Sequence, residues 1–276
     1  MRLSIVMIAK DDEAHIGRAL SSVVPQLGEG CELVCVDDRS SDGTRRLMEE
    51  SGARVASTAD LPSGGVAAAR NLGASLASGD YLYHMDSDDE LVSGAVERML
   101  AATEGDPDVV RVPHAENFRA DECVVRPVRE RSVEQQPFSP PAPWAKMVRR
   151  PLWVPFPDCG VRLCLNPAWH FLQSDRFETF AFVDGPPCYV WDRTIQGAGT
   201  RTVEWSAVNP RTLEQIAFSD ELERLGLMKE WPADFLRSVA LMMDIGPRLT
   251  RPHVRAAWRS RLGAELRNLM TGRYVH

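Results

Sequence analysis

The sequence predicts an α/β fold in which helices sandwich a mostly parallel sheet, followed by a helical C-terminal extension. Residues 1–113 alternate short apolar runs with stretches of helical spacing, a pattern typical of βα units. The apolar runs are nearly continuous, as expected for strands buried on both faces. Clusters of aspartate directly follow two of them, and ligands of such sheets bind beyond the carboxyl ends of the strands.

The expected elements follow one another at regular spacing. Leu3–Ala9 is interpreted as a first strand rather than a signal peptide, because the charged run 10–13 follows it without a small-residue cleavage site. Ala14–Val24 has helical spacing, with apolar residues on one side. Turn formers and helix caps separate the later elements. These are strands Glu32–Val36, Arg54–Ser57, Tyr81–Met85 and Val109–Val112, and helices Arg45–Ser51, Gly64–Ser78 and Ser93–Ala102.

The pattern changes after residue 113. A hairpin is expected near Cys123–Val128, and the proline-rich stretch 137–157 excludes long regular elements. Residues 211–270 have the apolar spacing of amphipathic helices. We therefore divide the chain into three regions, 1–113, 114–205 and 206–276.

Composition excludes several classes of protein. With 276 residues, 44% of them hydrophobic, the chain can bury a sizeable core, so it is not a disordered protein. No apolar run approaches the roughly 20 residues of a membrane-spanning helix. The six cysteines form no C-x-x-C pair, which argues against a zinc or disulfide framework and favours a reducing cytoplasm.

The C-terminal end is strongly basic, although the net charge of the whole chain is −7. From Gly246 onward there are seven arginines and a single acidic residue, Glu265. This stripe has three interpretations: a helix packed on the core with a solvated basic face, a helix lying on an anionic membrane, or a contact with nucleic acid phosphates. We expect a cytoplasmic protein, with peripheral membrane association as the alternative.

Three aspartates after the fourth strand carry the first chemical signal. Asp86 and Asp88 are two positions apart, so at a strand end their side chains point to the same side. Paired carboxylates of this kind bind hard divalent ions such as Mg²⁺ or Mn²⁺, which in turn hold phosphate oxygens. The alternative for Asp86, Asp88 and Asp89 is a solvated acidic turn before a helix.

Two further segments add to that signal. Asp37 and Asp38 follow the second strand, where carboxylates can accept hydrogen bonds from a base and a ribose; a helix cap is the alternative. Arg70 lies in a helix of small residues, where an inward-facing guanidinium would match a diphosphate. A surface arginine is the alternative there.

Four segments together resemble the family 2 glycosyltransferases of the GT-A fold. They are S-I-V-M-I-A-K-D-D-E, L-V-C-V-D-D-R-S-S-D-G-T, A-A-A-R-N-L-G and Y-L-Y-H-M-D-S-D-D, in that order within residues 3–112. Farther on, P-W-A-K-M-V-R-R-P-L-W and the segment 188–193 resemble parts of the capsule- and cell-wall-type members. The resemblance makes 1–113 the nucleotide-sugar half and 114–205 the acceptor half of one GT-A domain.

The resemblance implies a nucleoside-diphosphate sugar donor, usually UDP-linked, with Mn²⁺ or Mg²⁺ and inversion at the anomeric carbon. It implies a metal contact at Asp88. The nucleotide-binding positions that it implies are Ala9, Asp11, Glu13, Asp37, Asp38, Arg70 and Asp86. A dehydrogenase is excluded because no G-x-G-x-x-G follows the first strand, and an NDP-sugar-forming nucleotidyltransferase because no glycine-rich basic loop does.

The general base is where the sequence departs from the family. Members carry a Glu-Asp pair ahead of the segment 188–193, and residues 160–170 contain none. Asp158 and Asp175 are the favoured bases, Glu178 is a further candidate, and His170 is a possible base or metal ligand. Without an identified base, a non-catalytic nucleotide-sugar-binding module stays open. The acceptor also stays open: a glycan, a lipid, a protein or a modified nucleic acid base.

Overall fold

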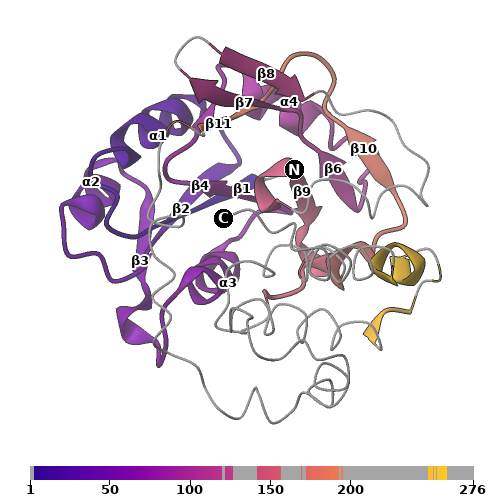
Figure 1. Cartoon of the computed structure of the whole chain (residues 1–276), viewed down its shortest axis with the longest axis horizontal. Helices are drawn as coiled ribbons and strands as arrows, with labels where there is room; N and C mark the ends of the chain where they lie inside the picture. The colour runs from indigo at the N-terminus through magenta and orange to yellow at the C-terminus, as the bar shows by residue number, and fades with distance from the viewer. Residues whose placement is uncertain are drawn as a thin grey trace, which may run out of the picture.

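The computed structural model of the chain describes residues 3–119, 122–126, 142–156, 169, 172–192, 194, 248–250, 252 and 254–259. Within them lie two sheets (Figure 1). The larger has seven strands in the order β10-β6-β9-β4-β1-β2-β3, and the smaller has four in the order β5-β11-β7-β8. The mixed α/β fold with a mostly parallel central sheet agrees with the fold predicted from the sequence.

The elements have the following bounds. The larger sheet contains β1 (Leu3–Ala9), β2 (Cys31–Asp37), β3 (Arg54–Ser57), β4 (Tyr81–Asp86), β6 (Val109–Arg111), β9 (Lys146–Arg149) and β10 (Phe180–Phe182). The smaller contains β5 (Glu90–Leu91), β7 (His114–Arg119), β8 (Glu122–Arg126) and β11 (Tyr189–Asp192). The α-helices within residues 3–119 are α1 (Ile16–Val23), α2 (Thr44–Glu50), α3 (Val66–Leu76) and α4 (Ala95–Ala101).

The central strand β1 is buried on both faces, as its continuous apolar run predicts. Leu3, Ile5 and Met7 are fully buried in one core cluster together with residues of α1 and α4. Val6 points to the other face and packs in a second cluster with Ala74 of α3. The sheet therefore has helices on both sides, and α1 and α3 approach it from opposite faces (Figure 1).

A glycine sets how closely α3 approaches the sheet. A Cβ at Gly73 would lie less than 3.0 Å from Cγ1 of Val6 and 3.2 Å from Cγ2 of Val36. Only a residue without a side chain fits there. Because residues three apart share one face of a helix, the same approach brings Arg70 down toward the carboxyl end of β4.

The elements expected in residues 1–113 are all present, with ends shifted by a few residues at most. Three strands in the described residues were not anticipated: the short β5 and β10, and β9 in the centre of the larger sheet. β9 lies in the proline-rich stretch and runs antiparallel between β4 and β6. Its four residues fit between Pro143 and Pro151, so the prolines limit the length of this strand without preventing it.

The later part of the chain is described in pieces. A hairpin is present as the antiparallel pair β7 and β8, but it begins at His114, so only β8 overlaps the expected range Cys123–Val128. Of the expected C-terminal helical region, residues 252 and 254–259 are helical, residues 249 and 250 have no regular secondary structure, and residues 211–247, 251, 253 and 260–270 lie outside the described residues. No helix in the described part of the chain is long and apolar enough to cross a membrane.

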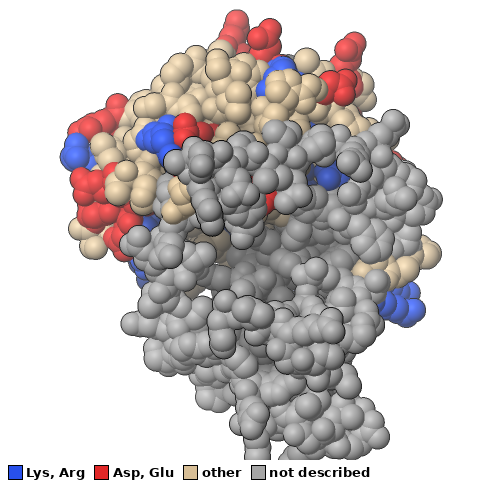
Figure 2. Space-filling model, turned by 45° about the horizontal axis from the view of Figure 1, so that its top comes forward, with Lys and Arg blue, Asp and Glu red and all other residues tan. Residues whose placement is uncertain are grey.

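Acidic and basic side chains lie side by side at the left edge of Figure 2, where α2 forms the ion pairs Arg45–Glu49 and Arg46–Glu50.

Candidate active site

The carboxyl ends of β1, β2 and β4 meet at one edge of the larger sheet. The three strands are parallel, and the register places Ala9 beside Asp37 and Ile8 beside Asp86. Asp37 and Asp86 therefore flank the end of β1. The two acidic clusters that follow separate strands in the sequence come together at this edge, as the predicted topology requires.

Asp37, the last residue of β2, and Asp38 after it are buried and bonded inside the protein. Asp38 is 6% exposed, and its carboxylate accepts hydrogen bonds from Oγ1 of Thr58 at 2.6 Å and from the backbone N–H of Gly65 at 2.8 Å. Asp37 is 3% exposed and accepts a bond from Oγ of Ser57 at 3.3 Å. Both carboxylates thus fix the rim of the edge, including the turn that leads into α3.

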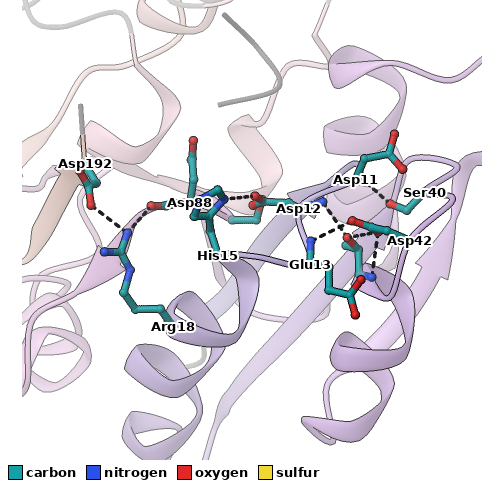
Figure 3. A network of polar contacts seen from close by, with 11 residues as sticks. Asp11, Asp12, Glu13, His15, Arg18, Ser40, Asp42, Asp88 and Asp192 are labelled. Carbon is teal, nitrogen blue, oxygen red and sulfur yellow. Dashed lines mark hydrogen bonds and ion pairs between the residues drawn. The ribbon is translucent and has the colours of Figure 1, made fainter. Parts of the chain in front are cut away.

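The loops after β1 and β2 are bonded to each other (Figure 3). Asp11 has a left-handed backbone conformation, and its carboxylate accepts a hydrogen bond from the N–H of Ser41 at 2.7 Å. Glu13 accepts one from the N–H of Gly43 at 3.0 Å. Ala9, at the end of β1, is 5% exposed beneath them. The acidic side chains of these loops therefore hold the rim in one arrangement.

Arg70 faces inward, which decides against the surface alternative. Its side chain is 5% exposed, and Nη2 lies 2.8 Å from Oδ1 of Asp86. The guanidinium also lies over the ring of Phe156, 5.2 Å from its centroid. The Asp86 side chain is 34% exposed, so this ion pair stands at the boundary between the protein interior and the open edge.

Asp12 and Asp86 lie near enough to the loop after β4 for their charges to act on Asp88 in that loop. The Asp12 carboxylate accepts a hydrogen bond from Oγ of Ser87 at 2.6 Å and pairs with Nδ1 of His15 at 2.7 Å (Figure 3). Burial, followed by the negative charges of Asp86 and Asp12, raises the pKa of Asp88 to about 6. Mutual repulsion of this kind is relieved by a bound cation, and carboxylate oxygens are the donors that Mn²⁺ and Mg²⁺ prefer. The residues present therefore suit a divalent ion.

Asp89, the third aspartate after β4, has a structural role. Asp89 is 1% exposed and accepts hydrogen bonds from the hydroxyl of Tyr189 and, at 2.8 Å, from the N–H of Asp192. Burial, with the charges of Asp86 and Asp88, raises its pKa to about 9. Asp89 thus anchors the loop to β11, and the solvated-turn alternative is wrong for this residue.

The remaining predicted residues are less informative. Among the described residues, no group of three or more His, Cys, Asp or Glu side chains is arranged to hold a metal ion, so Asp86 and Asp88 form at most a partial set of ligands. His170 and Asp158 lie outside the described residues. Oδ2 of Asp175 accepts two hydrogen bonds from Thr250, from its N–H at 2.8 Å and from its hydroxyl at 2.7 Å.

Sequence reasoning overlooked several residues of this edge. Asp12 gave a weak signal, since it adjoins two acids that were noted. Arg18 gave none, because its partners are distant in the sequence. Ser87 and Asp192 lie within segments that resemble the family, but their contacts with Asp12 and Arg18 were not foreseen. Tyr189 was noted as part of a motif, without the contact that it makes with Asp89.

Comparison with known proteins identifies similar sequences over the part of the chain that builds this edge. Residues 4–139 match the family model described as Glycosyl transferase family 2. The chain is 34% identical over 100 residues to the UDP-Glc:alpha-D-GlcNAc-diphosphoundecaprenol beta-1,3-glucosyltransferase WfgD of Escherichia coli, a match covering 36% of this chain and 40% of that protein. It is 34% identical over 104 residues to the poly(ribitol-phosphate) beta-glucosyltransferase of Bacillus spizizenii, covering 36% and 16%. The matches thus span less than half of these relatives.

A solved structure extends the likeness in fold. The structure of S. aureus TarS 1–349 in complex with UDP-GlcNAc superposes with a TM-score of 0.62, covering 98% of this chain and 82% of that chain. The sequence identity is 16%, so this likeness concerns the fold alone.

Proposed function

We propose that this chain, which belongs to glycosyltransferase family 2, transfers a sugar from a nucleoside-diphosphate sugar, with UDP as the leaving nucleotide, to an acceptor hydroxyl. One observation carries the proposal: Asp86 ends β4 at the sheet edge where ligands of α/β folds bind, with Asp88 two residues on and the buried Arg70 paired to Asp86. That edge lies within the residues that match the family model.

Asp88, with Asp86 beside it, would hold Mn²⁺ or Mg²⁺. A divalent ion bound there would neutralise charge on the departing diphosphate. Two carboxylates are a small set of ligands, but Mg²⁺ in particular is commonly held by one or two carboxylates, with substrate phosphates and water on the other positions. A raised pKa of about 6 leaves Asp88 mainly ionised at neutral pH, as a ligand must be.

Arg70 would bind the diphosphate. Its guanidinium is already oriented by Asp86 and by the ring of Phe156, so little conformational freedom is lost when a phosphate is bound. We propose that the nucleotide lies along the rim formed by Ala9, Asp11, Glu13, Asp37 and Asp38.

The proposed chemistry is an inverting transfer. A carboxylate takes the proton of the acceptor hydroxyl, whose oxygen attacks the anomeric carbon on the face opposite the diphosphate; the bond to the diphosphate breaks. Asp158 and Asp175 are the proposed bases, and His170 is a proposed base or metal ligand. The two hydrogen bonds from Thr250 to Asp175 favour Asp158 of the two.

Release of nucleoside diphosphate tests this function. UDP-, GDP- and dTDP-sugars are incubated with the protein, with and without Mn²⁺ or Mg²⁺, and the free diphosphate is measured. We expect slow metal-dependent release from a UDP-sugar, at least 100-fold slower in Asp88→Asn, because loss of a metal ligand removes stabilisation of the leaving group. Glu97→Gln, an exposed acid on α4, is the matched control and retains the activity.

A nucleotide-sugar-binding module is the second candidate, because residues 160–170 lack the Glu-Asp pair. It predicts metal-dependent binding of UDP without release of diphosphate, even when acceptor glycans, lipids or nucleic acids are added. If the protein neither binds any donor nor releases diphosphate from it, both candidates are refuted.

A further inference from the structure

Arg18 of α1 connects three parts of the chain at the loop after β4. Its Nη2 donates to the backbone carbonyl of Asp88 at 3.0 Å and to Oδ2 of Asp192 at 2.9 Å (Figure 3). Its Nε lies 2.9 Å from Oε1 of Glu90. One side chain thus bridges a helix of the first region, the loop that carries Asp88, and strand β11 of the smaller sheet.

Strand β11 holds the same loop from the inside. Asp89 is bonded to the hydroxyl of Tyr189 and to the backbone N–H of Asp192. The same Tyr189 hydroxyl accepts a hydrogen bond from the N–H of Asp86 at 3.4 Å. Asp192 is itself fixed, because its Oδ1 accepts two bonds from Thr194. The loop is therefore clamped between β11 and Arg18, and Asp192 takes part on both sides.

We propose that Arg18 is a positioning residue for the divalent ion: it ties the peptide of Asp88 to Asp192 and thereby sets where the Asp88 carboxylate lies. This rests on the proposed function, in which Asp88 holds that ion. The carbonyl that Arg18 contacts belongs to Asp88 itself, so losing the bond lets this peptide rotate and moves the carboxylate away from Asp86. Metal sites depend on such supporting contacts, and their loss costs roughly 10-fold to 100-fold in metal affinity.

The fork shape of the guanidinium matters more than its charge. The Arg18 side chain is 42% exposed, so its ion pairs with Glu90 and Asp192 contribute little to stability by themselves. Its contacts with a carbonyl and two carboxylates need several donors in fixed directions. Lysine keeps the charge but has a single ammonium on a flexible stem, and is expected to restore only part of the effect.

The chain offers a matched control in Arg98. This arginine of α4 donates to the backbone carbonyls of Asp184, Pro186 and Pro187, which precede β11. It therefore also ties a helix to the neighbourhood of β11, but none of its hydrogen bonds involves the loop after β4. A purely structural role for Arg18 predicts that the two arginines behave alike.

The experiment compares Arg18→Gln, Arg18→Lys and Arg98→Gln in the full chain. Mn²⁺ affinity in the presence of UDP is measured by electron paramagnetic resonance, amide hydrogen exchange of residues 86–92 by mass spectrometry, and thermal stability by calorimetry. We expect Arg18→Gln to bind Mn²⁺ roughly 10-fold more weakly and to exchange faster at residues 86–92, with Arg18→Lys intermediate. Arg98→Gln is expected to lower thermal stability similarly and to leave Mn²⁺ affinity unchanged.

Two results would overturn the proposal. One is unchanged Mn²⁺ affinity in Arg18→Gln; the other is an equal loss in Arg98→Gln, which would trace the effect to stability. If the unmodified protein binds neither Mn²⁺ nor UDP, the proposed function fails, and hydrogen exchange alone decides the role of Arg18. Faster exchange confined to Arg18→Gln would then support the tie between Asp88 and β11, and equal exchange in both variants would refute it.

Discussion

Replacing Gly73 by alanine tests how α3 is placed on the sheet. The added methyl would lie under 3.0 Å from Cγ1 of Val6 and 3.2 Å from Cγ2 of Val36, whereas ordinary contacts begin at 3.4 Å. Val6 and Val36 are both 0% exposed in the centre of the sheet, so neither can move aside. Overpacking a core in this way costs about 1–3 kcal/mol.

The helix itself gains from the same substitution. Alanine is favoured over glycine inside a helix by about 1 kcal/mol. We therefore expect Gly73→Ala to lower the free energy of unfolding by up to about 2 kcal/mol, the difference between the two effects. Because Arg70 lies one turn away on the same face, lifting α3 also moves its guanidinium away from Asp86, so UDP affinity should fall.

Gly17 provides the matched control. It lies in α1 with no atom within 4 Å of the position that a Cβ would take, and its backbone is helical. Gly17→Ala should therefore raise the free energy of unfolding by about 0.5–1 kcal/mol. Urea unfolding of both variants measures these changes, and calorimetric titration measures UDP affinity. Stabilisation by Gly73→Ala equal to that by Gly17→Ala would refute the close approach of α3.

Two further predictions concern Asp108, which precedes β6, and Arg70 of α3. Burial alone would raise the pKa of Asp108, but hydrogen bonds from two backbone N–H groups just before β10 and the charge of Arg149 lower it on balance. A lowered folded-state pKa stabilises the fold above the unfolded value of about 3.9 and loses that contribution as the pH falls through the folded value. Urea midpoints at pH 7 and pH 3 should therefore differ more for the unmodified protein than for Asp108→Asn, and an equal difference would contradict this. Arg70→Lys should weaken UDP binding by about tenfold, because lysine cannot contact Asp86 and a phosphate with the same fork, and unchanged affinity in calorimetric titration would disprove that role.

Most elements of the first 113 residues were predictable because the central strands β1, β2 and β4 are buried on both faces. A strand such as Leu3–Ala9 must then be apolar at nearly every position, and that run is visible in the sequence without knowing its neighbours. The convergence of Asp37 and Asp86 followed from parallel topology alone. By contrast, β9 was missed, because four residues between prolines leave no periodic pattern.

The roles within the carboxylate clusters depend on partners distant in the sequence. The sequence alone does not distinguish Asp86, Asp88 and Asp89, but in the structure Asp89 is hydrogen-bonded to Tyr189, 100 residues later. Asp38 is equally ambiguous until Thr58 and Gly65 are seen to surround it. A pattern can indicate that acids gather at an edge, whereas their separate tasks are set by tertiary contacts.

Two arginines, from helices on opposite faces of the sheet, hold the end of β4. Arg70 of α3 fixes the side chain of Asp86, and Arg18 of α1 fixes the backbone of Asp88. These contacts act on residues two apart, so they set the separation of the two carboxylates. A shift of either helix would therefore change that separation even when neither aspartate is substituted. The packing of α3 at Gly73 and of α1 beneath Arg18 is therefore part of the proposed metal site, although no residue of either helix is a proposed ligand.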